Sequence, residues 1–112
     1  MISKLPHQLR LLIVDDDEVD RMALQRVLKQ TQLNVRVDEA VDAESALTTI
    51  DQSEFDCLFL DYNLPGDNGL ALTHKIRDRG IRAPLIVLTG QGDEQTAVEL
   101  MKAGASDYLP KN

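Results

Sequence analysis

Acidic residues follow two separate apolar runs of the chain, and together they could hold a cation. The run at residues 11–14 is followed by five acids within residues 15–20, and the run at residues 57–60 is followed by Asp61. Carboxylates that lie within a few ångström of one another repel, which raises a pKa or requires a cation. Mg²⁺ suits such a group because it is a hard ion that takes oxygen ligands and pairs readily with phosphate. The acids therefore indicate a magnesium site if the fold brings them together.

Two further side chains would complete a site for a phosphoryl group. Thr89 follows the apolar run at residues 85–88, and Lys111 comes soon after a weaker run at residues 108–109. A hydroxyl and an ammonium can both donate hydrogen bonds to phosphoryl oxygens, and an aspartate can attack phosphorus to form an aspartyl-phosphate. A single Asp after a strand is commonly only a helix N-cap, which we expect of Asp17. The joint pattern favours metal-assisted phosphoryl transfer onto a carboxylate.

The elements that must position these residues alternate along the chain. Short apolar runs typical of strands occur at residues 11–14, 35–37, 57–60, 85–88 and 108–109. Between them, apolar residues recur with helical spacing, in the stripes Leu24/Val27/Leu28, Ala43/Ala46/Leu47/Ile50, Leu72/Thr73/Ile76 and Ala97/Leu100/Met101. Candidate N-caps precede these stripes at Asp17, Asp42, Asn68 and Asp93.

This alternation of strands and helices predicts βαβ units and a parallel sheet. The first, third and fourth runs are apolar at every position, as expected for central strands covered on both faces. The run at residues 35–37 alternates with charged residues, which is typical of an edge strand. Ligands of open parallel sheets bind beyond the carboxyl ends of the strands. All the residues with candidate chemistry are therefore expected at one rim of the sheet.

The composition describes one globular domain and excludes several classes of protein. Of 112 residues, 43% are hydrophobic and 28% are charged. The net charge of −7 is opposite in sign to that of most electrostatic nucleic-acid binders. The only cysteine, Cys57, excludes an internal disulfide and a multi-cysteine zinc site. No run is long enough to span a bilayer and no signal-peptide core begins the chain. We expect a cytoplasmic protein with a leader at residues 1–9 and one domain at residues 10–112.

The same residues resemble the receiver domain of bacterial two-component response regulators. The resemblance runs from Leu11 to Lys111, and it is carried by four segments, residues 12–16, residues 61–65 with Gly69, residues 87–90 and residues 103–111. It implies an α/β fold, a flavodoxin-like three-layer sandwich whose five-stranded parallel sheet has the order 2-1-3-4-5. It also implies a function, that of a signalling switch controlled by phosphorylation.

The resemblance implies a role for each residue of the acidic rim. Asp61 would be the phosphoacceptor and would also contact the metal. Asp16 would be a direct Mg²⁺ ligand, and Asp15 would hold a metal-bound water. The backbone carbonyl of Asn63 would be the third protein ligand.

The resemblance likewise implies which residues read the phosphoryl group. Lys111 would pair with its oxygens, and Thr89 would hydrogen-bond to it and move toward it on activation. Tyr108 resembles the aromatic residue that rotates inward when the threonine shifts. A histidine kinase or phosphotransfer protein would supply the phosphoryl group. The domain would catalyse its own phosphorylation and dephosphorylation and would not be an enzyme with a separate substrate.

The chain departs from the family pattern in two places. Gly90 replaces a commoner small residue, and Asn112 follows the lysine where the family usually has proline. We therefore expect the last helix of the fold to be missing from this chain, and a bare apolar face over the fourth and fifth strands. That face would favour self-association into a homodimer, unless Leu5 and Leu9 of the leader fold over it.

Two other functions remain open from the residues. A phosphatase of the haloacid dehalogenase type also uses an aspartyl nucleophile and Mg²⁺, but its second acid would fall at Asn63, which cannot transfer a proton. A pseudo-receiver, which binds partners and never turns over, is the other alternative. Metal-dependent phosphorylation by a small phosphodonor would separate a pseudo-receiver from an active receiver.

Overall fold

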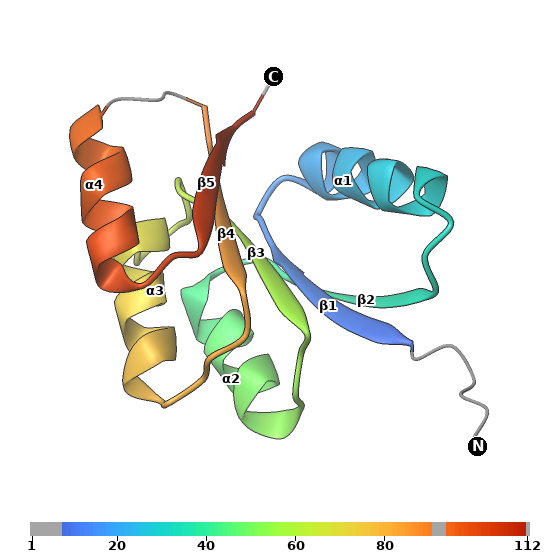
Figure 1. Ribbon diagram of the computed structural model, residues 1–112, viewed down its shortest axis with the longest axis horizontal. Coiled ribbons are helices and arrows are strands. Elements are labelled where there is room, and N and C mark those ends of the chain that lie inside the picture. The colour runs from blue at the N-terminus through green and yellow to red at the C-terminus, as the bar shows by residue number, and fades with distance from the viewer. Residues whose placement is uncertain (1–7, 91–93, 112) are drawn as a thin grey trace, which may run out of the picture.

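The computed structural model describes residues 8–90 and 94–111, in which five parallel strands alternate with four helices (Figure 1). The elements in chain order are β1 Leu9–Val14, α1 Glu18–Gln30, β2 Val35–Ala40, α2 Ala43–Gln52, β3 Cys57–Asp61, α3 Gly69–Asp78, β4 Leu85–Thr89, α4 Glu94–Ala103 and β5 Asp107–Pro110. The sheet has the order β2-β1-β3-β4-β5. The predicted fold class and strand order are therefore confirmed.

The centre of the sheet is apolar on both faces. Leu12 of β1 is paired with Leu58 of β3, and Val14 is paired with Leu60. All four side chains are buried, because helices cover the sheet on both sides. Among the described residues, strand β2 pairs only with β1 and stays partly exposed, as expected for an edge strand.

Three of the four predicted helix N-caps are confirmed. The side chains of Asp17, Asp42 and Asn68 each accept a hydrogen bond from a backbone N–H in the first turn of α1, α2 and α3. Asp93, the fourth, lies outside the described residues, as do residues 1–7 of the expected leader and Asn112. Strand β1 begins at Leu9, whose N–H donates to the carbonyl of Asn34 at 2.9 Å.

The two faces of the sheet are covered unequally. Helices α2, α3 and α4 lie together on one face, and α1 lies on the other (Figure 1). No residue of α1 is fully buried, and Val27 of its predicted apolar stripe is 56% exposed. A hollow of about 320 Å³ separates α1 from the sheet, with Leu24 on the helix side and Phe59 and Leu88 on the sheet side. Within residues 8–90 and 94–111, no helix has the length and apolarity that crossing a membrane requires.

Candidate functional site

The carboxyl ends of β1 and β3 bring three predicted acids together. Because Val14 and Leu60 are partners in the register, the next residues, Asp15 and Asp61, leave the sheet side by side. One carboxylate oxygen from each of Asp15, Asp16 and Asp61 lies within 4.8 Å of the others. Asp15 and Asp61 are only 3% and 6% exposed, whereas Asp16 is open to solvent. The three carboxylates form a half-buried cluster of hard oxygen donors, which fits a divalent cation.

Lys111 reaches this carboxylate cluster from the end of β5. Its backbone N–H donates to the carbonyl of Thr89 at 2.7 Å, which extends the pairing of β5 with β4 beyond Pro110. Its Nζ lies 2.9 Å from Asp15 Oδ2 and 3.2 Å from Asp61 Oδ1. Lys111 therefore already touches the predicted acceptor, as a residue that offsets charge on a phosphoryl group must do.

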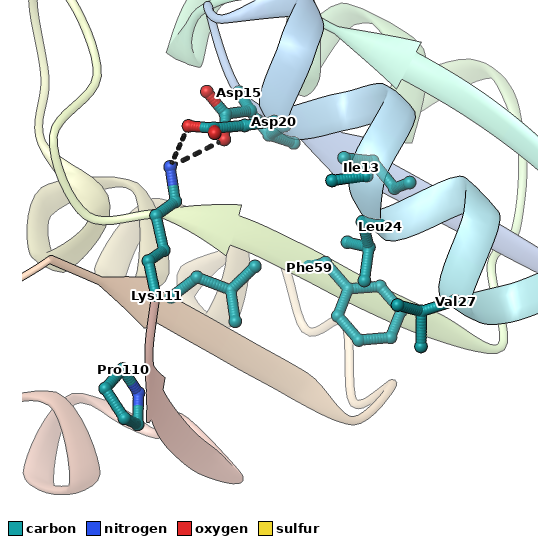
Figure 2. Close-up of a pocket in the computed structure, with 11 residues that line it drawn as sticks. Ile13, Asp15, Asp20, Leu24, Val27, Phe59, Pro110 and Lys111 are labelled. Carbon is teal, nitrogen blue, oxygen red and sulfur yellow. Dashed lines mark hydrogen bonds and ion pairs between the residues drawn. The ribbon is translucent and has the colours of Figure 1, made fainter.

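A third carboxylate, from Asp20 of α1, also contacts Lys111. Its Oδ2 lies 2.7 Å from Lys111 Nζ, nearer than the oxygens of Asp15 or Asp61. Figure 2 shows the lysine extended toward Asp15 and Asp20 at the mouth of the hollow beneath α1. No role was predicted for Asp20, although it closes the acidic run at residues 15–20.

The charges in the site perturb one another. Burial raises the pKa of Asp61, and the nearby charge of Asp15 raises it further, while Lys111 acts in the opposite direction. Burial lowers the pKa of Lys111, but its hydrogen bonds to Asp15 and Asp20 outweigh this effect and raise the pKa above its ordinary value. The ammonium therefore stays charged. Burial and Asp15 together outweigh the effect of Lys111 on the pKa of Asp61, so a further cation bound beside Asp61 would favour the charged form of this carboxylate.

Local packing fixes the loops that carry the acids. Asp15 Oδ1 accepts from the N–H of Asp17 at 2.9 Å, and the Asp15 carbonyl accepts from Nη1 of Arg21 at 2.8 Å. After β3, the N–H of Gly69 donates to the carbonyl of Tyr62 at 2.7 Å. A Cβ at Gly69 would lie 2.8 Å from Tyr62 Cα, so only glycine fits there.

The remaining predicted residues lie around this centre. The N–H of Asn63 donates to Asp61 Oδ1 at 3.3 Å, which brings its backbone beside the acceptor. Thr89 ends β4 and is buried next to the pairing of β4 with β5. Tyr108 is half-buried on β5 and packs against the hydrophobic core. The fold thus gathers the predicted acceptor, metal and phosphoryl-binding residues at one rim, with Tyr108 two positions before the strand's end.

Comparison with known sequences agrees with this geometry. The family model for the response regulator receiver domain matches residues 11–112. Protein PetR of Rhodobacter capsulatus is 39% identical over 111 residues, which cover 99% of this chain and 44% of PetR. The chain spans half or less of the length of four curated relatives of this kind.

Solved structures show the same likeness. A LuxR-family two-component response regulator from Aurantimonas superposes with a TM-score of 0.87 at 28% identity, over 95% of this chain and 76% of that one. A response regulator protein from Burkholderia pseudomallei, solved with a phosphorylated aspartic acid, a calcium ion and citrate, gives 0.81 at 33% identity, over 92% and 59%. Family match, fold and acidic rim agree, and the chain belongs to the response regulator receiver domain family.

Proposed function

We propose that this chain is a signalling switch that accepts a phosphoryl group on Asp61. One observation carries the proposal. The buried carboxylate of Asp61 belongs to the same cluster as those of Asp15 and Asp16, and its Oδ1 lies 3.2 Å from the ammonium of Lys111. A carboxylate held between a cation site and a lysine is placed to attack phosphorus, because both neighbours offset the negative charge of the incoming group.

The phosphoryl donor is a phosphohistidine of a histidine kinase or phosphotransfer protein. A carboxylate oxygen of Asp61 forms the new O–P bond while the P–N bond to the imidazole breaks, and the leaving imidazole takes up a proton. Lys111 binds the oxygens of the group in transit and orients it toward Asp61. Later, a water molecule attacks phosphorus, the O–P bond to Asp61 breaks and inorganic phosphate leaves, which restores the carboxylate, so the switch resets itself without acting on a separate substrate.

The proposed cation is Mg²⁺, which supplies charge neutralisation for the phosphoryl oxygens when it is bound. Asp16 and Asp61 would ligate it directly, Asp15 would hold one of its waters, and the carbonyl of Asn63 would complete the protein ligands. Support comes from the short separation of the three carboxylate oxygens and from the position of the Asn63 backbone against Asp61. The exposure of Asp16 leaves the outer side open to water and phosphate.

The phosphoryl group then biases two residues beyond the acceptor. Thr89 would donate its hydroxyl to a phosphoryl oxygen and move toward Asp61, and Tyr108 would turn inward into the space that Thr89 leaves. The burial of Thr89 at the end of β4 and the half-buried position of Tyr108 on β5 support this coupling. The change is a shift between two packed arrangements, driven by a local charge.

Acetyl phosphate tests the function directly. With Mg²⁺ present, the 112-residue chain should gain one phosphate group, seen by intact mass spectrometry, and chelation of Mg²⁺ by EDTA should prevent the gain. The reason is that the transfer needs the cation to offset charge on the phosphoryl oxygens. A folded chain that is never labelled, with Mg²⁺ at any concentration, would instead be a pseudo-receiver.

Replacing Asp16 tests the metal site. Asp16→Ala should weaken Mg²⁺ binding about tenfold or more, because it removes a direct carboxylate ligand. A Mg²⁺ titration followed by backbone amide NMR shifts measures the dissociation constant. Glu18→Ala is the matched control, since Glu18 is exposed on the same segment and outside the carboxylate cluster. Equal affinity in Asp16→Ala and the parent chain would place the metal elsewhere.

A further inference from the structure

We infer that Asp20 is a positioning residue for Lys111, which it holds on the α1 side of the site so that the cation can enter. This inference rests on the proposed function, because it concerns how the same site takes up Mg²⁺. Asp20 Oδ2 lies 2.7 Å from Lys111 Nζ, and it makes the shortest of the three carboxylate contacts of that ammonium.

The three partners of Lys111 differ in what else they must do. Asp15 and Asp61 belong to the carboxylate cluster that fits a divalent cation, and Asp20 does not. In the structure Lys111 therefore occupies two of the carboxylates that Mg²⁺ needs. A cation of charge +2 that enters the cluster repels the ammonium of Lys111. It also competes with that ammonium for the carboxylates of Asp15 and Asp61. Asp20 is the partner that Lys111 keeps.

The local structure places Asp20 for this role. Asp17 caps α1, so Asp20 is the third residue of the helix and its carboxylate is favoured there by the helix dipole. Arg21 fixes that turn, because it donates to the carbonyl of Asp15 and pairs with Glu39 Oε1 at 3.2 Å. The side chain of Asp20 is 40% exposed and that of Lys111 is 23% exposed, so their contact is more open to solvent than the buried residues Asp15 and Asp61. Figure 2 shows the two side chains meeting.

Loss of Asp20 should make Lys111 a competitor of the metal. Without this partner, the ammonium would keep Asp15 and Asp61 as its carboxylate partners among the described residues and would settle closer to both. Mg²⁺ would then have to displace a more tightly held cation from its own ligands. The expected consequence is weaker Mg²⁺ binding that depends on the presence of Lys111, beyond the general effect of removing one negative charge.

The test compares two variants of equal charge. Asp20→Asn should raise the dissociation constant for Mg²⁺ about three- to tenfold, and Glu18→Gln should raise it by less than about twofold, because exposed charges interact weakly through water. Amide NMR shifts measure both titrations, and the same spectra show that each variant is folded. Equal effects of the two substitutions would overturn the inference.

A double-mutant cycle separates positioning from simple charge. In a Lys111→Met background there is no ammonium to hold, so adding Asp20→Asn should weaken Mg²⁺ binding no more than adding Glu18→Gln does. If the full effect of Asp20→Asn persists without Lys111, Asp20 acts on the metal by itself and the inference is wrong. Failure of the parent chain to bind Mg²⁺ or to be labelled by acetyl phosphate is a different result, since it defeats the proposed function.

Discussion

The Asp61→Asn variant is expected to take up no phosphate from acetyl phosphate under conditions that label the parent chain completely. An amide is not a nucleophile toward phosphorus at neutral pH, and the other carboxylates of the site are committed to the cation and to the turn after β1. Intact mass spectrometry after incubation with acetyl phosphate and Mg²⁺ measures the result. We expect at least a thousandfold loss, which on the scale of barriers is roughly 4 kcal/mol.

Loss of labelling in this variant should not reflect unfolding. The pKa of Asp61 is raised by burial and by Asp15, so this carboxyl group destabilises the folded state progressively as the pH rises from its ordinary pKa through the raised pKa, and the full cost is present above it. A neutral amide removes this cost, and Lys111 keeps its contacts with Asp15 and Asp20. Urea unfolding should therefore show a variant at least as stable as the parent. Asp78→Asn, on an exposed position of α3, should be labelled normally. Phosphate found on another carboxylate of the Asp61 variant would contradict the assignment.

The sheet and its acidic rim were predictable because both depend on patterns local in sequence. Each central strand contains a short run that is apolar at every position, which is typical of a parallel strand covered on both faces. An acid directly after such a run must leave the sheet at its carboxyl end. The resemblance to receiver domains implied that β1 and β3 are neighbours, and the structure makes Val14 and Leu60 register partners, so Asp15 and Asp61 meet.

The contact between Asp20 and Lys111 could not be predicted in the same way. The two residues are 91 positions apart, and their meeting depends on how closely the first turn of α1 approaches the end of β5. Helical spacing gives the face on which an acid lies but not the distance to the next layer. The number of acids after β1 could have suggested this contact. Two carboxylates are enough to bind a cation there and one is enough to cap α1, so the remaining acids are free for another role.

The exposure of Val27 has a similar origin. The stripe of Leu24, Val27 and Leu28 predicts which face of α1 is apolar, and the helix does lie over the sheet. Burial also requires neighbours that fill the space around the stripe. Here a hollow lies between the helix and Phe59, so Val27 remains 56% exposed.

Substitution of Lys111 and of Thr89 should affect two different steps of the switch. Lys111→Ala should slow labelling by acetyl phosphate about hundredfold at saturating Mg²⁺, because the ammonium beside Asp61 no longer offsets charge on the transferring group. Thr89→Ala should keep the labelling rate within about threefold, since its hydroxyl acts mainly after the group has arrived. Initial rates by mass spectrometry measure this difference, and Lys102→Ala, which removes an exposed lysine from α4, is the control for charge alone.

The NMR signals of the Tyr108 ring report the second step. In the parent chain they should shift on phosphorylation, as Thr89 moves toward the phosphoryl group and Tyr108 turns inward. In Thr89→Ala the chain should be labelled and the Tyr108 signals should stay near their unphosphorylated positions, because nothing draws the end of β4 toward Asp61.

Lys111→Ala should bind Mg²⁺ more strongly than the parent chain, because it removes an ammonium that competes with the cation for Asp15 and Asp61. The slow labelling of this variant therefore cannot arise from a lost cation. Equal loss of labelling in both variants, or a full Tyr108 shift without the threonine hydroxyl, would show that the two residues do not divide the work between transfer and response.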